Sequence, residues 1–514
     1  MENKKNKSEI KIGAVLSYII IILNMVVGIV YTPILTNALG QSEYGLYSLV
    51  STIISYLTIL DFGFGNAIII YTSKYHTKGE IAKERKLHGM FFVIYLIIGI
   101  VAGFIGIIIA LNVNKIFGRS MTVEEIEKAK KLMIILSFNL VFTFAFSIYS
   151  SIITAYEKFI FQKLINIFRI ILQPLIMLVL LHYGYRSVAL VIVITILNFA
   201  TLLANAFYCK TRLNIKFTFG KFDKVLFLEI VSYSVWIFLN TIMDKINWSL
   251  DQTILGIVSG TVMVSIYSIA GQLDQMYLSF STAISNVLLP KVAKMEANKA
   301  SDEEFTDIFI KTGRIQYIVL AIIMSGFILF GREFINITWV GHDYDQSYFI
   351  ALVLMIPLTY PLIQNMGLNI IQAKNQYKYR VKVLFIFAIF NAVISVFFAK
   401  KWGGIGAAWG TSLSIIMGQG FFMNWFYYKK THIDIPEFWK QILKMTIPIV
   451  ICTCIGWGIK SVWKVNSNLV LFAQILIYCV IYAFIMYNFG MNNYERDLFT
   501  KPFKKLNKNA KTNK

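Results

Sequence analysis

Apolar runs of about 20 residues follow one another along almost the whole chain, with short polar stretches between them. A helix of this length crosses the roughly 30 Å hydrocarbon core of a bilayer, so the pattern predicts an all-α polytopic membrane protein with about fourteen transmembrane helices. A transmembrane barrel is excluded, because its strands alternate apolar and polar residues. The spans are expected at residues 12–38, 44–73, 89–111, 131–155, 160–182, 187–209, 225–256, 261–290, 310–331, 347–372, 381–399, 404–428, 441–460 and 468–490.

Polar residues recur on one face of the expected span at 225–256. Asn240, Asp244, Asn247 and Asp251 follow one another at steps of four, three and four residues, which places them on one side of a helix. An ionised carboxylate facing lipid costs about 2.5–3.5 kcal/mol even on the lowest scales. These side chains are therefore expected to face the interior of a helix bundle or a water-filled cavity.

A second polar face follows on the expected span at 261–290. It comprises Ser268, Gln272, Gln275, Ser279, Thr282 and Asn286, with Asp274 beside it. Such residues also join neighbouring membrane helices by hydrogen bonds, and any single one of them fits that role equally well. Two long polar faces that include acids favour a polar passage, around which the other spans are arranged.

Short sequence similarities indicate an internal repeat. Gly40 precedes a Tyr-Ser pair by seven residues, and so does Gly260, while the turn that begins at Gly184 resembles the turn that begins at Gly403. We therefore expect two six-helix bundles in the same orientation around a central cavity, 1–210 and 211–430. Two additional peripheral helices in 431–490 and a basic cytoplasmic tail, 491–514, complete the expected organisation.

Charge and hydropathy fix the expected location of the chain. Its 514 residues have a formal net charge of +22 and a mean hydropathy of +0.64. The basic residues lie in short loops between apolar spans, which argues against nucleic acid and for membrane topology. With a cytoplasmic N-terminus, inward segments contain 37 of the 49 Lys and Arg residues and outward segments 11. The positive-inside rule thus predicts a multi-pass plasma-membrane protein with both termini in the cytoplasm.

The sequence does not favour metal, cofactor or catalytic chemistry. The four cysteines have neither metal-binding nor disulfide spacing, and the five histidines are scattered over loops and span ends. Thr122 with Glu125 and Ser301 with Glu304 have the spacing of helix N-caps in the two longest loops. We expect no catalytic residue, no metal and no cofactor.

Several short motifs occur in order along nearly the whole chain. They are Tyr44-Gly45-Leu46-Tyr47, Leu60-Asp61-Phe62-Gly63-Phe64-Gly65, Asp251-Gln252-Thr253-Ile254-Leu255-Gly256, Ile266-Tyr267-Ser268-Ile269-Ala270 and Gly403-Gly404-Ile405-Gly406-Ala407-Ala408. As an ordered set they resemble the O-antigen and capsule polysaccharide flippases of the Wzx type, in the multidrug/oligosaccharidyl-lipid/polysaccharide exporter superfamily. The resemblance implies two six-helix bundles around a central cavity, with two extra helices.

The resemblance also implies a function. Such a protein transfers an undecaprenyl-diphosphate-linked oligosaccharide repeat unit from the cytoplasmic to the outer leaflet of the bacterial plasma membrane. Polysaccharide biosynthesis for a capsule or for lipopolysaccharide is the implied setting. Alternating access is the expected mechanism, and the identity of a coupling ion, H⁺ or Na⁺, stays open.

A lipid-linked diphosphate needs a cation, and its sugars need polar side chains. Lys245 and Arg169 are the only strongly basic residues well inside expected spans, which makes them the candidates for the diphosphate. Alternatively, Lys245 pairs with an acid, either Asp244 or Asp274 of the next span, and Arg169 extends its guanidinium to the cytoplasmic surface.

The other candidate residues lie on the two polar faces. Those expected to bind substrate are Asn240, Asn247, Gln272 and Gln275. A buried carboxylate changes its charge when it binds H⁺ or Na⁺, so the ion-coupling candidates are Asp244, Asp251 and Asp274. A structural, hydrogen-bonded role for Asp251 near the outer mouth is the alternative.

Two other classes of protein fit the sequence less well. An ion-coupled multidrug exporter of the same superfamily would have the same architecture, and transport of cationic dyes would distinguish it. A polysaccharide polymerase or a lipid-sugar transferase would need a loop with catalytic residues, so we do not expect an enzyme. The expected partners are membrane lipids and the lipid-linked oligosaccharide, and a polysaccharide polymerase stays an open one.

Overall fold

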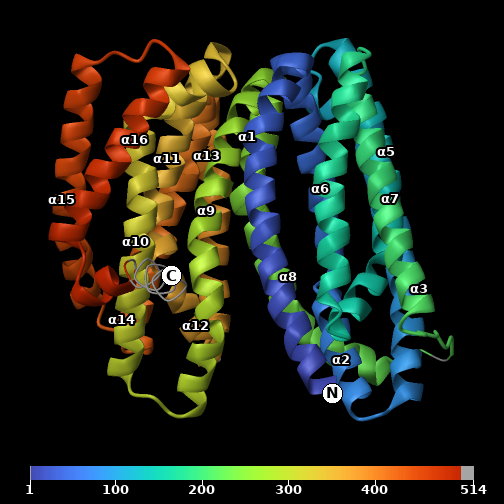
Figure 1. Ribbon diagram of the computed structural model, residues 1–514. Coiled ribbons are helices and arrows are strands. Elements are labelled where there is room, and N and C mark those ends of the chain that lie inside the picture. Colours follow the sequence, from blue (N-terminus) through green and yellow to red (C-terminus); the bar gives the residue numbers. More distant parts are fainter. Residues whose placement is uncertain (1, 221, 375, 499, 501–514) are drawn as a thin grey trace, which may run out of the picture. The chain divides into compact units, whose positions relative to one another are not determined.

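The computed structural model describes residues 2–220, 222–374, 376–498 and 500, and in these ranges it contains helices and no strand (Figure 1). Most of the predicted basic tail, residues 501–514, lies outside them. The helices are α1 (Glu2–Leu57), η1 (Thr58–Asp61), α2 (Phe64–Thr77), α3 (Ile81–Leu111), α4 (Val113–Phe117), α5 (Val123–Ala155), α6 (Phe159–His182), α7 (Ser187–Thr211), α8 (Lys224–Val258), α9 (Gly260–Ala297), α10 (Asp302–Glu333), η2 (Phe334–Trp339), η3 (His342–Tyr344), α11 (Asp345–Ile363), α12 (Asn365–Ala373), α13 (Tyr377–Ile415), η4 (Ile416–Phe422), α14 (Met423–Lys430), α15 (Ile435–Val462), α16 (Asn468–Ile485) and η5 (Met486–Gly490).

The lengths and composition of these helices confirm the predicted all-α polytopic fold. Ten helical segments of the described chain are long and apolar enough to cross a membrane, and the bent pair Lys224–Ser232 and Ile237–Val258 adds an eleventh. Two of the ten, Val15–Thr77 and Tyr379–Lys430, contain 63 and 52 residues, which is enough for two crossings each. The predicted span at 261–290 lies in α9, which is not one of these segments, and each of the other predicted spans overlaps one of them.

The four glycines of the predicted repeat all have a positive φ angle. Gly40, Gly184, Gly260 and Gly403 have φ values of 77°, 82°, 80° and 59°. This left-handed region is open to glycine without a steric cost. Gly40 and Gly403 interrupt α1 and α13, so each of these long helices turns there from one crossing into the next. The division into two six-helix bundles stays a prediction.

The helix starts predicted in the two longest loops are confirmed. Thr122 accepts the backbone N–H of Glu125 at the start of α5, and Glu125 Oε2 accepts the N–H of Thr122 at 2.8 Å. Ser301 and Glu304 form the same reciprocal pair at the start of α10. Each pair satisfies two backbone donors that an uncapped helix would leave without a partner.

The chain forms two compact units, which are described separately. Unit 1 comprises residues 1–269 and 384–411, and unit 2 comprises residues 270–383 and 412–514. In unit 1, α5 packs against both α3 and α7, and α1 packs against α6 (Figure 1). This packing places three polar helices, α5, α6 and α7, beside one another.

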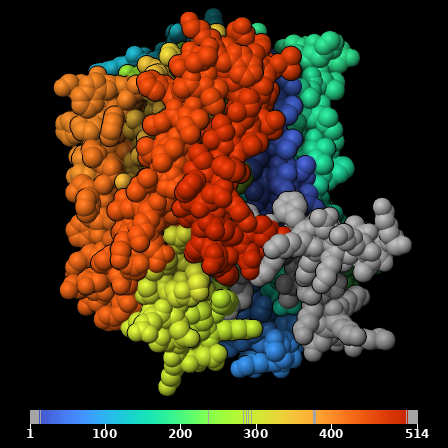
Figure 2. All heavy atoms as spheres, turned by 60° about the vertical axis from the view of Figure 1, so that its left-hand side comes forward, coloured from blue at the N-terminus to red at the C-terminus, as the bar shows by residue number. Residues whose placement is uncertain are grey.

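Unit 2 has an apolar core between α10, α15 and α16. Phe330 of α10, Cys452 of α15 and Tyr478 of α16 belong to one buried cluster. The same unit contains a buried ion pair. Arg314 of α10 donates to both carboxylate oxygens of Glu495 at 2.5 and 2.9 Å, and both side chains are buried. The outer faces of α15 and α16, orange to red in Figure 2, form part of the surface of this unit.

Candidate functional site

Asp251 is the best-defined candidate in unit 1. Its carboxylate is 3% exposed and lies between α8, α9 and α13. Tyr267 and Thr411 both donate a hydroxyl to Asp251 Oδ2, Thr411 at 2.6 Å. Asp251 Oδ1 has no hydrogen-bond partner among the described residues. The acid thus has hydroxyl donors but no cationic donor in this part of the chain.

Two further side chains extend this polar cluster along α13. Asn391 Oδ1 accepts the hydroxyl of Ser395 at 2.9 Å and lies 3.1 Å from the hydroxyl oxygen of Thr411, whose single proton is donated to Asp251 at the shorter distance. Asn391 Nδ2 lies 3.4 Å from Asn247 Oδ1, at the long limit of a hydrogen bond. Carboxylate, amide and hydroxyl oxygens of this kind are also the ligands that hard cations prefer. Among the described residues, no group of His, Cys, Asp and Glu has a metal-binding arrangement.

The structure divides the predicted polar face of α8 into two parts. Asn247 and Asp251 face α13, as described above. Asn240 Nδ2 donates to Asp244 Oδ2 at 2.9 Å, and Asp244 is exposed. The four residues therefore do not form one uniform surface. Asn247 and Asp251 contact α13, whereas Asn240 is half-buried and Asp244 is exposed.

Lys245 is half-buried on α8 and forms no ion pair within 4 Å with any described residue. Asp244 is adjacent in sequence, so the two side chains point about 100° apart on the helix. The ammonium group of Lys245 is thus not paired with a carboxylate of the described residues, which is what binding of an external anion requires. Asp274, the other acid considered for it, belongs to unit 2.

Arg169 lies on a polar face of α6 that the sequence reasoning missed. Gln162, Asn166, Arg169 and Gln173 recur at steps of four, three and four, and all four are half-buried. The opposite face of α6 is exposed and apolar, with Leu164, Phe168, Ile171, Leu175 and Val179. These steps are the same as those of the polar face on α8, so the sequence contains the signal for this face too.

Polar groups of α5 contact both this face of α6 and the neighbouring helix α7. Gln162 Nε2 donates to the backbone oxygen of Ser150 at 2.7 Å, and Thr154 donates to Gln162 Oε1 at 3.1 Å. Higher on α5, Asn139 Oδ1 accepts Asn198 Nδ2 of α7 at 2.7 Å. Some of these groups therefore join helices, whereas Arg169 forms no ion pair with a described residue.

In unit 2 the predicted polar residues of α9 lie on different sides of the helix. Gln275 is exposed and Gln272 is half-buried. Asp274 is 1% exposed, and neither of its carboxylate oxygens has a hydrogen-bond partner among the described residues. The side chain of Asn286, at the end of the predicted face, lies outside the described part.

Farther along α9, its buried face is joined to α10 and α12 by hydrogen bonds. Gln316 Nε2 of α10 donates to the hydroxyl oxygens of Ser281 and Ser285 at 3.0 and 2.6 Å. Asn369 of α12 donates to the backbone oxygen of Ser285 at 3.1 Å. This part of α9 is therefore held by polar contacts between helices, whereas Gln275 is exposed and Gln272 is half-buried.

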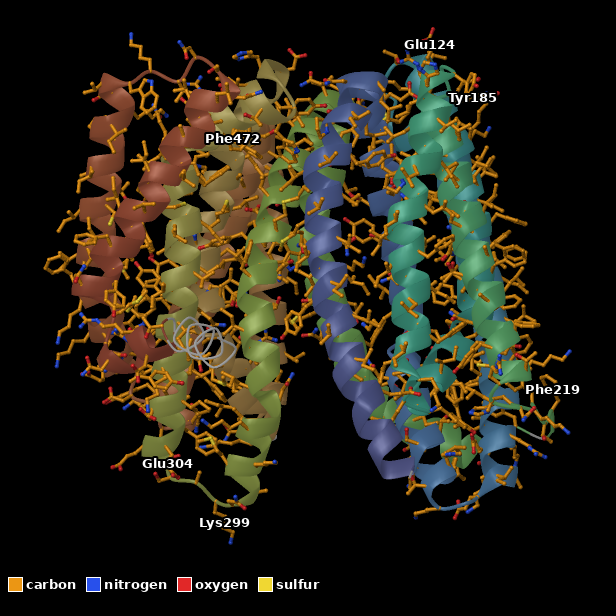
Figure 3. All side chains as sticks on the ribbon, viewed as in Figure 1. Glu124, Tyr185, Phe219, Lys299, Glu304 and Phe472 are labelled. Carbon is orange, nitrogen blue, oxygen red and sulfur yellow. The ribbon has the colours of Figure 1, made fainter. Side chains whose placement is uncertain are left out.

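A second polar network closes one end of unit 1. The hydroxyl of Thr261 on α9 donates to Glu125 Oε1 at 2.6 Å, and Ser42 of α1 donates to the same oxygen. Ser120 donates to the backbone oxygen of Gly256 at 2.6 Å. These hydrogen bonds join three parts of the chain: α1 just after Gly40, the start of α5, and the turn at Gly260. They lie at the end of the unit where Figure 3 labels Glu124 and Tyr185.

The fold is similar to that of solved transporters of the MOP superfamily. A structure titled lipid II flippase MurJ, inward closed conformation, has a TM-score of 0.70 and 17% identity, covering 96% of this chain and 99% of its own. An inward-facing multidrug resistance MATE family transporter of the MOP superfamily has a TM-score of 0.62 and 13% identity, covering 77% of this chain and 96% of its own. The TM-scores show a shared fold, and at these low identities the comparison shows the fold alone.

The chain belongs to the polysaccharide biosynthesis protein family, whose model matches residues 11–296. A Haloferax volcanii protein described as probable low-salt glycan biosynthesis flippase Agl15 is 23% identical to it over 242 residues. That match covers 46% of this chain and spans about half, 49%, of the length of the relative. The predicted recognition of the chain as a relative of the polysaccharide flippases is confirmed.

Proposed function

We propose that the protein flips an undecaprenyl-diphosphate-linked oligosaccharide repeat unit from the cytoplasmic to the outer leaflet of the plasma membrane. The observation that carries this proposal is the pair of unpaired basic side chains, Lys245 and Arg169, on polar membrane helices of a polysaccharide biosynthesis protein. A buried basic group without a protein acid is costly unless an anion compensates it, and a diphosphate is such an anion. No catalytic role is proposed for any residue.

The polar side chains are proposed to replace water around the sugars. Asn240, Asn247, Gln272 and Gln275 offer amide donors and acceptors, which suit hydroxyl-rich ligands. Gln275 is exposed, and Asn240 and Gln272 are half-buried, whereas Asn247 is within reach of Asn391. Asn247 therefore has the weakest claim to a direct contact with sugar.

Ion coupling is proposed to act through Asp251. Its buried carboxylate has one oxygen without a hydrogen-bond partner among the described residues, beside Asn391, Ser395 and Thr411. Binding of H⁺ or Na⁺ there would remove an uncompensated charge from a membrane helix. Asp244 is exposed and is therefore a weaker candidate. Asp274 is buried, but neither of its carboxylate oxygens has a hydrogen-bond partner among the described residues, so it is also weaker.

Transport is proposed to follow alternating access, with the network of Ser42, Glu125 and Thr261 closing the outer end of unit 1. This network lies beyond the first crossing of α1, at the turn at Gly40. With the N-terminus in the cytoplasm, as the positive-inside rule favours, that turn is on the outer side. The C-terminus is likewise proposed to be cytoplasmic.

A multidrug exporter is the less supported alternative. The MATE transporter covers 77% of this chain, against 96% for MurJ. The family model and the Haloferax relative also favour a glycan substrate. A polysaccharide polymerase stays a proposed partner, because it would act on the same lipid-linked oligosaccharide after transfer.

The test is reconstitution of the purified protein in liposomes that contain a fluorescent undecaprenyl-diphosphate oligosaccharide in one leaflet. We expect its transfer to the other leaflet to depend on the protein and on an H⁺ or Na⁺ gradient. Export of a cationic dye without movement of the glycolipid would support the multidrug exporter instead.

A further inference from the structure

Unit 1 has a groove on its membrane-facing surface that the proposed transport cycle does not use. Its volume is about 450 Å³. The residues that line it are Tyr149 of α5, Leu203, Ala206, Phe207 and Lys210 of α7, and Ile215 and Phe217 of the linker that follows α7.

Ile215 and Phe217 of this linker form a fixed floor for the groove. The N–H of Thr218 donates to the backbone oxygen of Arg85 on α3 at 3.1 Å. The ring of Phe217 stacks on Tyr149 with a centroid distance of 5.4 Å, and it also contacts Phe92 at 5.6 Å. Because aromatic contacts hold Phe217 from both α3 and α5, the groove exists before any ligand enters.

The groove opens from the lipid-facing side of α7. This side is marked by exposed large apolar residues at steps of four, three, four and four, namely Ile192, Ile196, Phe199, Leu203 and Phe207. Residues at these steps share one face of a helix. In a membrane that face meets acyl chains, so a chain lying along α7 reaches the groove directly.

Lys210 lines the groove, and the sequence that follows it is basic. Residues 210–220 contain Lys210, Arg212 and Lys216 but no Asp or Glu. The next acid, Asp223, is 3.7 Å from Lys86. Figure 3 labels Phe219 of this linker at the end of unit 1 opposite Glu124 and Tyr185, which corresponds to the inner leaflet in the proposed topology. Near an anionic surface each Lys or Arg contributes about 1 kcal/mol of attraction.

We propose that this groove binds one anionic phospholipid of the inner leaflet. Its phosphate lies at Lys210, and one acyl chain lies against Tyr149, Phe207 and Phe217. The apolar walls select a chain, while the basic end selects a negative headgroup over a zwitterionic one. This inference does not depend on the proposed flippase activity.

The test measures the melting temperature of the full-length protein in neutral detergent, with added phosphatidylglycerol or phosphatidylcholine. A ligand that binds the folded protein raises this temperature. Ala206→Trp fills the groove from α7, and Ala200→Trp is its matched control at an exposed position two turns earlier. Lys210→Gln removes the charge and keeps the walls.

We expect phosphatidylglycerol to raise the melting temperature of the wild type and of Ala200→Trp more than phosphatidylcholine does. Ala206→Trp should lose the response to both lipids, and Lys210→Gln should respond equally to both. The phosphatidylglycerol retained through purification, measured by mass spectrometry, should fall in Ala206→Trp alone of the two Trp variants. An unchanged response in Ala206→Trp would overturn the proposal. So would displacement of phosphatidylglycerol by equimolar undecaprenyl phosphate, which would assign the groove to the substrate chain.

Discussion

Thr411 donates its hydroxyl to Asp251 Oδ2 at 2.6 Å, although the two residues are 160 positions apart in the sequence. This hydrogen bond connects α13 with α8 inside unit 1. Asp251 is the acid with the most polar surroundings among the three ion-coupling candidates, since Tyr267 also donates to the same oxygen. The pair therefore provides the most direct test of ion coupling.

Asp251→Asn removes the charge at nearly constant shape. We expect the gradient-driven component of glycolipid transfer to fall at least about tenfold, equivalent to ~1.4 kcal/mol in the activation barrier, because the amide no longer changes charge with ion binding. Asp244→Asn is the matched control on the same helix, and its exposed side chain predicts a smaller effect. The measurement is transfer in liposomes with and without an imposed H⁺ or Na⁺ gradient. A full gradient response in Asp251→Asn would assign the acid a structural role.

Thr411→Val removes one of the two hydroxyl donors to Asp251 and keeps the side-chain volume. Loss of a buried hydrogen-bond partner costs about 1–3 kcal/mol, so we expect a lower melting temperature as well as a shifted ion dependence of transport. Ser412→Ala is the control for lost stability, because that hydroxyl bonds the backbone oxygen of Val353 in unit 2. If both variants lose stability and only Thr411→Val shifts the ion concentration for half-maximal transport, Thr411 belongs to the ion site. Equal ion dependence in both would exclude it.

Lys245→Ala tests the proposed contact with the diphosphate. We expect loss of glycolipid transfer with normal accumulation in the membrane, because an unpaired ammonium contributes little to the fold. Lys245→Arg should retain part of the activity, since it keeps the positive charge. Transfer by each variant is compared at equal protein amounts in liposomes.

A double variant separates the two explanations for Lys245. If Lys245 only neutralised Asp274, then Lys245→Ala combined with Asp274→Ala would transport again. We expect the double variant to stay inactive, because Lys245 is proposed to act on the substrate. Recovery would show that the diphosphate role is wrong.

The polar face of α6 predicts different effects on its two sides. Asn166→Leu and Gln173→Leu should each reduce glycolipid transfer, because both side chains flank Arg169 at one helical turn. Leu175→Gln, on the exposed apolar face of the same helix, should leave transfer near the wild-type rate. Similar losses in all three variants would show that the residues around Arg169 serve only the fold of α6.

The sequence predicts the helices of this protein better than its polar contacts. Helix spans follow from apolar runs, and the caps at Thr122 and Ser301 follow from local spacing, because both depend on residues that are close in the chain. The contact between Asp251 and Thr411 depends on packing of α8 against α13, which helical periodicity does not contain. For the same reason, periodicity predicts one face for Asn247 and Asp244, yet Asn247 lies within reach of Asn391 on α13, whereas Asp244 is exposed.

A disulfide can test the proposed closure at the outer end of unit 1. The hydroxyls of Ser42 and Thr261 are 3.3 Å apart, so cysteines at both positions are close enough to pair after a small rearrangement. The surrounding helices are in intimate contact, since a Cβ added to Gly45 would lie only 1.8 Å from the backbone oxygen of Thr261. Oxidised Ser42→Cys/Thr261→Cys should therefore stop glycolipid transfer, and a reducing agent should restore it.

The controls for this closure distinguish gating from misfolding. The double-cysteine protein should transport when reduced, and each single cysteine should transport under both conditions. Gly45→Ala should also lower transfer, because the added methyl group separates α1 from α9, whereas Gly458→Ala on α15 has open space at its Cβ and should not. Undiminished transfer by the oxidised double variant, with the disulfide verified by mass spectrometry, would mean that this end of unit 1 stays closed throughout the cycle. The substrate would then have to leave by a path that does not separate Ser42 from Thr261.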